Sequence, residues 1–264
     1  AGTTWNHTAI AMATPLDPAK FFTATLIERR DLTHDLATFK FTTDSPFDFT
    51  PGQYATLAIE HEGKLVQRPY SIVSSPHESF LEFFIELVPE GAMSPLIWKL
   101  SVGDQLAIRK RIVGRFVLDT TRGASNHLMV ATVTGIAPFL SMARLQAHRL
   151  EQGTPAAGAA RMCMIHAGSH SIELSGYQQE IATLAERSSW LEYVPSISRP
   201  WDDPTWRGET GRADELVRLY ADRWKLAADQ SVAYSCGHPT MIENVRGILR
   251  RAGWPDDHIH EEKY

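Results

Sequence analysis

The sequence predicts two domains, an antiparallel β-barrel or sandwich followed by a doubly wound α/β domain with a parallel sheet. Short runs that alternate apolar and polar residues, separated by turn residues, fill the first half. Strand-like and helix-like patterns alternate through the second half. The length of 264 residues is enough for two domains of ordinary size, each with its own core.

The composition excludes several classes of protein. A hydrophobic fraction of 43% and a charged fraction of 22% are typical of globular proteins. The net charge of −5 argues against general nucleic-acid binding, which needs a basic surface. No run of eighteen apolar residues and no signal-peptide pattern is present, so we expect no membrane span. Cys163 and Cys236 cannot build a disulfide framework or a four-cysteine metal site, and they fit a reducing cytoplasm.

The first domain is expected at residues 21–120, after a loose and polar N-terminal arm at residues 1–20. Turn pairs such as Pro51-Gly52 separate its strands. Residues 114–118 are expected to close the barrel. The strands are expected at residues 22–28, 36–42, 54–60, 67–74, 80–87 and 105–111.

Four adjacent residues in the fourth of these strands suit a flavin nucleotide: Arg68, Pro69, Tyr70 and Ser71. An arginine can pair with a phosphate through two hydrogen bonds, and a tyrosine can stack on a flat ring system. A serine hydroxyl can donate to a ring heteroatom, and proline fixes the backbone. Taken alone, the tetrapeptide is equally compatible with an exposed edge strand.

A second turn follows residues 80–87, at Gly91, Ala92, Met93 and Ser94. We expect Ser94 to cap a short helix that has proline at its first position. The free N–H groups at a helix start bind phosphate, although most capped helices hold no ligand. This turn and the arginine of the fourth strand would hold two sides of one pyrophosphate.

The densest basic run is Arg109, Lys110 and Arg111, with Arg115 close behind. Such runs are most often solvated strand ends. The alternative is a docking rim for an acidic protein partner, because complementary charge speeds encounter.

The second domain is expected at residues 121–264 and begins with a linker at residues 121–125. Its alternating elements predict a parallel sheet that binds ligands at the carboxyl ends of its strands. Strands are expected at residues 127–132, 161–166, 191–196 and 231–235, and helices at residues 138–152, 174–187, 213–220 and 239–252.

Loops after the first and the last of these strands carry candidate binding residues. Thr134, Gly135 and Pro138 follow the first strand, where glycine allows a pyrophosphate to approach the backbone closely. Cys236 ends the last strand, and it is either a small buried residue or part of a nicotinamide pocket.

A third group of residues points to an additional phosphate. Ser198 and Arg199 end the third strand of this domain, and Arg212 follows across a loop rich in tryptophan. Two arginines facing one crevice would suit the 2′-phosphate that distinguishes NADP from NAD.

The order of these motifs resembles the ferredoxin–NADP reductase superfamily, and within it the bacterial ferredoxin/flavodoxin–NADP reductases. The resemblance covers roughly residues 21–264, from Arg-Pro-Tyr-Ser through Thr-Gly-Ile-Ala-Pro and Cys-Gly-His-Pro to a terminal Glu-x-Tyr. It implies a Greek-key β-barrel that binds FAD non-covalently and a five-stranded parallel α/β domain that binds NADP(H), or NAD(H). It also implies hydride transfer between NADP(H) and FAD, and single-electron transfer between FAD and a separate ferredoxin or flavodoxin.

The resemblance also assigns roles to individual residues. Arg68 would pair with the FAD pyrophosphate, and Tyr70 would lie against the isoalloxazine. Ser71 would approach the flavin N5 edge, and Tyr264 would shield the second flavin face. The residues expected beside the reacting rings are Ser71, Cys236, Glu262 and Tyr264.

Two positions depart from the family pattern. Val133 stands where the family usually has glycine, and Ser169-His170 stand where an arginine often reads the 2′-phosphate. Use of NADH therefore stays open beside use of NADPH. One alternative function is an NAD(P)H-dependent flavin or quinone reductase on the same fold, and another is a nucleotide-binding interaction module without redox chemistry.

Overall fold

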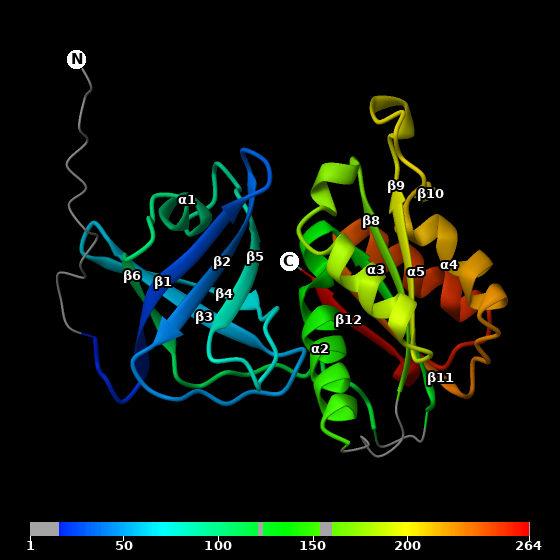
Figure 1. Cartoon of the computed structure of the whole chain (residues 1–264), viewed down its shortest axis with the longest axis horizontal. Coiled ribbons are helices and arrows are strands. Elements are labelled where there is room, and N and C mark those ends of the chain that lie inside the picture. The colour runs from blue at the N-terminus through cyan, green and yellow to red at the C-terminus, as the bar shows by residue number, and fades with distance from the viewer. Residues whose placement is uncertain (1–15, 121–123, 154–159, 264) are drawn as a thin grey trace.

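A computed structural model describes residues 16–120, 124–153 and 160–263. Two domains lie side by side, and helix α2 of the second lies next to the first (Figure 1). Among the residues described, no helix combines the length and the apolar character needed to cross a bilayer. Most of the arm predicted at residues 1–20, and residues 121–123 of the predicted linker, fall outside the described residues.

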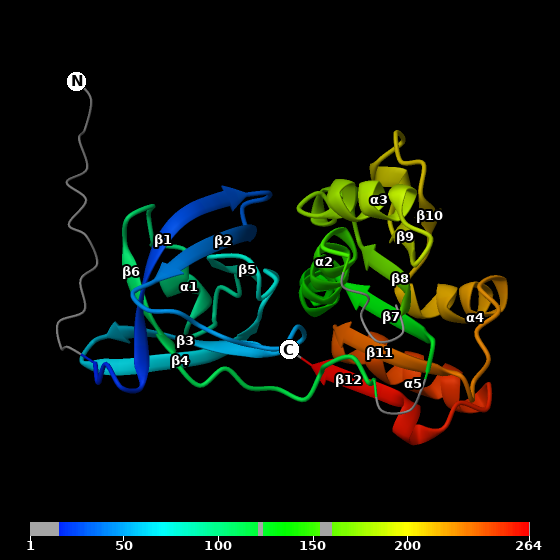
Figure 2. The same ribbon diagram turned by 60° about the horizontal axis from the view of Figure 1, so that its bottom comes forward.

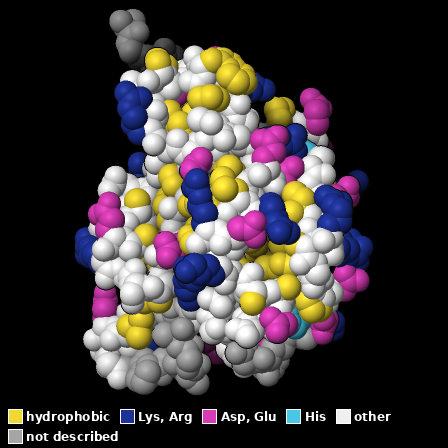
Figure 3. Space-filling model, turned by 90° about the vertical axis from the view of Figure 1, so that its right-hand side faces the viewer, with side chains coloured by type: hydrophobic (Ala, Val, Ile, Leu, Met, Phe, Trp, Pro, Cys, Tyr) yellow, Lys and Arg dark blue, Asp and Glu magenta, His cyan; other side chains and the backbone are white. Residues whose placement is uncertain are grey.

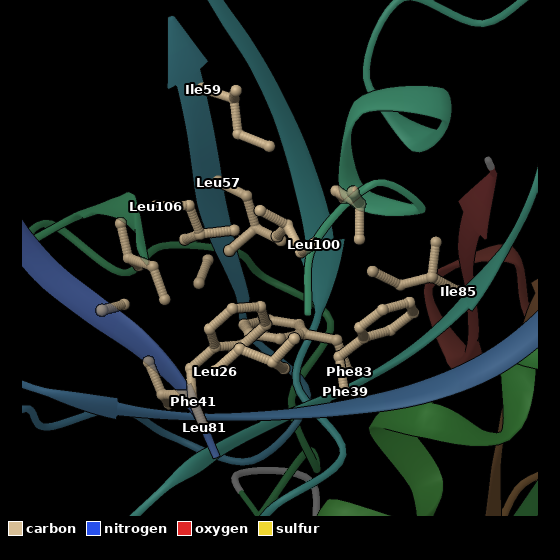
Figure 4. Close-up of a cluster of buried hydrophobic side chains, with 14 of the residues drawn as sticks. Leu26, Phe39, Phe41, Leu57, Ile59, Leu81, Phe83, Ile85, Leu100 and Leu106 are labelled. Carbon is tan, nitrogen blue, oxygen red and sulfur yellow. The ribbon is translucent and has the colours of Figure 1, made fainter. Parts of the chain in front are cut away.

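The first domain is a six-stranded antiparallel sheet in the order β4-β3-β6-β1-β2-β5. The sheet curls around a core of leucine, isoleucine and phenylalanine side chains, ten of which Figure 4 labels. Phe39 and Phe41 both enter this core, because alternate residues of a strand point to the same face. Its strands, all six of them predicted, are β1 (Phe21–Asp31), β2 (Leu36–Thr43), β3 (Tyr54–His61), β4 (Lys64–Ser71), β5 (Leu81–Glu86) and β6 (Gln105–Arg109).

Two local predictions for this domain are wrong. Ser94 is the first residue of helix α1 (Ser94–Ile97), and Met93 occupies the cap position. The Ser94 hydroxyl instead accepts a hydrogen bond from the main-chain N–H of Val88, at 2.9 Å. Residues 114–118 form no strand; they are part of a connection that Figure 2 shows in green below the barrel. Phe116 in this connection packs into the core of the second domain.

The second domain has a parallel sheet in the order β10-β9-β8-β7-β11-β12. The five-stranded sheet that the resemblance implies is present as β9-β8-β7-β11-β12, and the two-residue strand β10 extends one edge. The strands are β7 (Asn126–Thr132), β8 (Arg161–Gly168), β9 (Leu191–Ile197), β10 (Glu209–Thr210), β11 (Ser231–Gly237) and β12 (Ile259–Lys263). Strand β12 ends beside the barrel (Figures 1 and 2).

Helices cover both faces of this sheet. Helices α2 (Ala137–Glu151) and α3 (Gln178–Arg187) pack on one face, and α4 (Ala213–Arg223) and α5 (Pro239–Arg251) pack on the other. Figure 2 shows α2 between the sheet and the barrel. The central strands are therefore buried on both faces, which is why most of their residues are apolar. Helix α3 begins later than predicted, because a 3-10 turn at residues 171–173 and a second turn at residues 174–177 precede it.

The outer surface of the second domain, seen in Figure 3, carries acidic and basic side chains that are interspersed. Only small apolar areas lie between them in this view. Such a surface suits contact with water and presents no large apolar patch to a partner in this view.

Candidate functional site

A cleft of about 1040 Å³ lies between the two domains, along the carboxyl ends of the parallel strands. One wall comes from β4, β5 and the turn before α1, and the other comes from the loops after β7, β8, β9 and β11. This is the edge at which doubly wound sheets bind ligands. The predicted site residues that line the cleft are Arg68, Pro69, Tyr70, Ser71, Gly91, Ala92, Met93, Ser94, Thr134, Ser198, Arg199 and Arg212.

Four further predicted residues do not line the cleft. Gly135 and Pro138 are buried next to its floor, and Cys236 and Glu262 lie at the ends of β11 and β12. Tyr264 falls outside the described residues.

The predicted basic rim lies outside the cleft. Arg109 donates from Nε to Gln67 Oε1 at 2.8 Å, and its guanidinium lies over the Phe21 ring. Lys110 lies over the ring of Phe22, 5.3 Å from its centroid. These contacts restrain the first two residues of the run without neutralising their charge.

The barrel wall of the cleft ends in a cation next to an aromatic ring. Arg68 is exposed, and its guanidinium donates to the carbonyl of Gln67 at 2.7 Å. Tyr70 packs against the barrel core, and burial raises its pKa to about 12 although Arg68 acts in the opposite direction. The Tyr70 ring therefore keeps its proton at neutral pH.

The turn before α1 is held tightly to the end of strand β5. The N–H of Gly91 donates to the carbonyl of Val88 at 2.8 Å, and the Ser94 hydroxyl bonds both main-chain groups of Val88. A Cβ atom at Gly91 would lie 3.0 Å from the Val88 carbonyl oxygen. The turn is therefore compact, and it presents Ala92 and Met93 to the cleft.

The loops after β7 and β11 touch through their backbones. A Cβ atom at Gly135 would lie 2.1 Å from the carbonyl oxygen of Cys236, and one at Gly237 would lie 2.1 Å from Thr132 Oγ1. No larger side chain fits at either position without moving the other loop. The floor of the cleft is therefore one rigid backbone surface.

Val133, the departure from glycine, has a left-handed backbone with φ of +42°. This conformation is costly for a β-branched residue. The Val133 carbonyl accepts a hydrogen bond from Nε2 of His166 at 2.9 Å. Burial lowers the pKa of His166 to about 4, so its ring is neutral and carries the proton on Nε2. A glycine at position 133 would adopt this backbone conformation at little cost. In this chain the hydrogen bond from the buried His166 holds Val133 in it.

Three predicted residues meet where β4, β11 and β12 end. The Ser71 hydroxyl donates to Glu262 Oε2 at 2.9 Å, and Cys236 Sγ lies 3.9 Å from the same oxygen. Cys236 and Ser71 are both buried. Burial raises the pKa of Glu262, whereas the hydrogen bonds from Ser71 and Cys236 act to lower it. The cluster joins the barrel to the last strand of the other domain.

The far end of the cleft carries the two predicted arginines. Arg212 pairs with Asp214 at 3.3 Å and stands directly before helix α4. Main-chain hydrogen bonds of 3.0 Å tie Ser198 to Gly168 and Arg199 to Ser169. The ends of β8 and β9 are therefore fixed together, and the two arginines face a crevice that suits a phosphate.

Three acidic residues that line the cleft were not predicted from the sequence: Glu86, Glu173 and Asp214. Glu86 ends β5, and Glu173 lies on the opposite wall, where its carboxylate accepts from the N–H groups of Ser169 and His170. Burial raises the pKa of Glu86, and the charges of Asp35 and Glu173 add to that effect. Glu173 stands three residues after His170, and this capping-box spacing is the signal that was available.

Comparison with known proteins agrees with this arrangement. The oxidoreductase FAD-binding domain family matches residues 23–116, and the oxidoreductase NAD-binding domain family matches residues 129–247. A flavodoxin/ferredoxin–NADP reductase of Escherichia coli (strain K12) is 30% identical over 217 residues, which are 80% of this chain and 83% of that protein. A ferredoxin–NADP reductase of Pseudomonas aeruginosa is 26% identical over 249 residues, 87% of this chain and 92% of that one.

A solved structure has the same fold throughout. The ferredoxin NADP+ reductase from Neisseria gonorrhoeae, with bound FAD and NADP, superposes with a TM-score of 0.78 at 26% sequence identity. The match covers 92% of this chain and 98% of that chain. The cleft described above therefore belongs to a fold that holds both nucleotides in that relative.

Proposed function

The chain belongs to the ferredoxin/flavodoxin–NADP reductase family, and from that membership we propose that it transfers hydride between NADP(H) and FAD and single electrons between FAD and a separate acceptor protein. The observation that carries the proposal is the cleft, which has a candidate phosphate-binding site on each wall. Arg68 and the Gly91 turn lie on the barrel wall, and Thr134 lies on the opposite wall. Two nucleotides bound there would bring their ring systems together.

The barrel wall fits FAD. Within the described part of the chain Arg68 forms no ion pair, so its charge is available to a pyrophosphate. The compact turn of Gly91, Ala92, Met93 and Ser94 would approach the same pyrophosphate from the other side. Tyr70, un-ionised and half-buried, offers a flat surface to the isoalloxazine.

The opposite wall fits NADP(H). Thr134, Gly135 and Pro138 lie at the turn that leads into α2, and Thr134 lines the cleft. A pyrophosphate would bind at the N–H groups of this turn, and Gly135 lets the turn pack closely on the Cys236 carbonyl. Arg199 and Arg212, together with Ser198, would hold the 2′-phosphate. Since His170 stands where the family often has a further arginine, we expect a smaller preference for NADPH over NADH than three arginines would give.

When bound, FAD supplies the redox chemistry, since it takes up two electrons as a hydride and returns them singly. The side chains have to orient the rings and keep water out. Buried Ser71 and Cys236 and half-buried Glu262 form a cluster at the point where the two walls converge. Holding two rings in reactive contact lowers a barrier by several kcal/mol, on the order of the effect of orientation in intramolecular reactions. No strong general base is needed.

We propose a ferredoxin or flavodoxin as the acceptor, which makes the enzyme a ferredoxin/flavodoxin–NADP(+) reductase. Arg109, Lys110 and Arg111 are the proposed docking rim for such an acidic partner. We further propose that the FAD-binding domain spans residues 21–120 and the NADP-binding domain residues 121–264. A cytoplasmic location is proposed from the two cysteines, which are buried and free.

The test is the visible spectrum of the purified protein incubated with FAD. A bound flavin spectrum that bleaches anaerobically with NADPH is the expected result. Protein that stays colourless after incubation with FAD would reject the reductase function. Turnover with ferredoxin or flavodoxin should exceed turnover with free flavins and quinones. The reverse order would favour a flavin or quinone reductase on the same fold.

A further inference from the structure

We propose that helix α2 holds the NADP(H)-binding turn at a fixed distance from the flavin-binding strand, with Arg144 as a positioning residue for hydride transfer. The proposal rests on the proposed function and concerns side chains outside the cleft. Its basis is a set of contacts by which α2 crosses from the second domain to the barrel, directly behind the flavin motif.

Arg144 forms a buried ion pair between the domains. Its Nη1 lies 2.6 Å from Oε2 of Glu82 on strand β5 and 3.5 Å from Oε2 of Glu78. Its Nε and Nη2 donate to the two oxygens of Glu180 on α3, at 2.7 and 2.8 Å. The side chains of Arg144 and Glu82 are only 16% and 5% exposed. Water screens such a pair only weakly. Its hydrogen bonds fix the orientation of α2 relative to β5 as well as the distance between them.

The same face of α2 also holds the main chain that follows the flavin motif. The Ser141 hydroxyl donates to the carbonyl of Ser74 at 2.6 Å, and Nη1 of Arg144 lies 3.4 Å from the carbonyl of Val73. Ser141 and Arg144 are three positions apart, so both point to the barrel. The carbonyls that they contact lie two and three residues after Ser71.

The barrel holds this segment from the other side. The N–H of Val73 donates to the carbonyl of Glu82 at 2.8 Å, and the N–H of Glu82 donates to the Ser74 hydroxyl at 3.0 Å. Residues 73 and 74 are thus clamped between β5 and α2. Any shift of α2 against the barrel has to move the main chain that carries Tyr70 and Ser71.

The other end of α2 is the NADP(H)-binding turn. The helix begins at Ala137, immediately after the turn at Val133–Ile136. Seven residues separate Ala137 from Arg144, which is about 10 Å along a helix axis. An α-helix is stiff over that length, so the turn and the clamp move as one body. The helix therefore sets the distance between the NADP(H)-binding turn and the flavin-binding strand β4.

This role differs from holding the domains together. The hydrogen bond between Ser71 and Glu262 and the covalent connection between the domains do not involve Arg144. Loss of Arg144 should therefore leave a folded protein in which the two rings meet less well. A misplacement of about 1 Å can reduce a reaction rate on the order of a hundredfold.

The experiment compares wild type with R144M, S141A and the matched control R149M, which makes the same change on the exposed side of α2. Anaerobic stopped-flow reduction of the FAD-loaded enzymes at saturating NADPH gives the rate. We expect a fall of about tenfold or more in R144M and a smaller fall in S141A. The Kd values for FAD and NADPH should stay within about twofold, and the long-wavelength absorbance of the nicotinamide–flavin complex should weaken in parallel. R149M should match wild type.

The double variant R144M/E82Q separates positioning from a buried unpaired charge. If R144M is slow only because Glu82 is left unpaired, E82Q should restore both stability and rate. The proposal expects restored stability and a rate that stays low. A double variant at the wild-type rate, or variants that lose affinity for NADPH or FAD without losing rate, would overturn it.

A readout without cofactor distinguishes failure of the proposal from failure of the function. Amide hydrogen exchange at residues 72–74 should be faster in S141A and R144M than in wild type and R149M. Exchange rates at residues 72–74 that are the same in the variants and in wild type would reject the clamp. This result does not depend on which reaction the enzyme catalyses. Wild type that NADPH does not bleach rejects the proposed function instead. If R144M does not fold, S141A and the double variant carry the same test.

Discussion

Ser71 Oγ donates a hydrogen bond to Glu262 Oε2 at 2.9 Å, although the two residues are 191 positions apart and belong to different domains. The bond ties the last residue of β4 to β12. Glu262 is half-buried, and burial is the main reason why its pKa is raised. The junction of the two domains therefore contains an acid that holds its proton more tightly in the folded protein than in the unfolded chain.

Replacing Glu262 with Gln should change how stability depends on pH. The pKa of Glu262 is raised in the folded protein above its ordinary value of 4.5, so above that value the unfolded chain loses this proton more readily. The wild type should lose stability relative to E262Q as the pH rises from about 4.5 toward the folded pKa. Urea unfolding of both proteins between pH 4 and 8 measures this. A constant difference across the range would contradict the prediction.

The stacked histidines of the domain junction should make it sensitive to acid. His77 and His148 lie 3.9 Å apart with nearly parallel rings. Burial, then the charges of His148 and Arg144, lower the pKa of His77, whereas Glu78 and Glu151 act against this.

A histidine whose folded pKa is lowered opposes protonation, so stability should fall as the pH drops below 6.5, the ordinary value for His77. Thermal unfolding of wild type and H77N between pH 5 and 8 should show a smaller acid loss in the variant. If wild type and H77N lose the same amount of thermal stability at low pH, the histidine pair does not make the junction sensitive to acid.

Gly135→Ala should damage the floor of the cleft. The new Cβ would lie 2.1 Å from the Cys236 carbonyl oxygen, which is backbone and cannot rotate away. We expect a loss of stability of about 1–3 kcal/mol or more, together with weaker NADPH binding, because the two loops must separate. Gly247→Ala on α5 is the control, since its Cβ would meet only the flexible end of Arg251 at 3.3 Å. Equal NADPH affinity in G135A and wild type would show that the loops can separate without cost.

Arg68→Ala should weaken FAD binding by about 1–3 kcal/mol, which is the usual cost of losing a hydrogen bond to a charged group. Lys64→Ala is a control, because it removes a positive charge from the far end of the same strand. Titration of the apoprotein with FAD, followed by fluorescence, gives both affinities. Unchanged affinity in R68A would remove Arg68 from the site.

Arg199→Ala should weaken NADPH binding much more than NADH binding, because only NADPH carries the 2′-phosphate. Arg218→Ala, on the exposed side of α4 where it pairs with Asp222, should leave both affinities unchanged. Steady-state KM values for the two nucleotides measure the difference. Equal effects on both nucleotides would mean that Arg199 does not read the 2′-phosphate.

Much of the fold was predictable, because local patterns suffice where burial is regular. Strands such as β2 alternate apolar and polar residues, and the middle of β7 is a continuous apolar run because helices cover both of its faces. Strand β12 has no such pattern. Its residues Ile259–Lys263 are mostly charged and half-buried at a sheet edge, and pairing with β11 alone makes them a strand.

Part of the site could also be predicted, because some of its residues are neighbours in the sequence. Motifs such as that of Arg68 and Tyr70 are contiguous, so their chemistry can be read from the chain. Glu86 and Glu173 were missed because their meaning depends on two loops facing each other across the cleft. The use of His166 to hold Val133 was equally hidden, since the two residues are 33 positions apart.

The clamp on residues 73 and 74 acts on main-chain carbonyls. Every amino acid supplies that atom, so Val73 can change identity during evolution without losing its contacts to α2, whereas Ser74 also accepts a hydrogen bond from Glu82 through its hydroxyl. These contacts require particular side chains only on α2, where Ser141 and Arg144 supply the donors. A chimera that joins this second domain to the barrel of a relative should therefore keep the clamp, provided that the barrel has an acid at the position of Glu82.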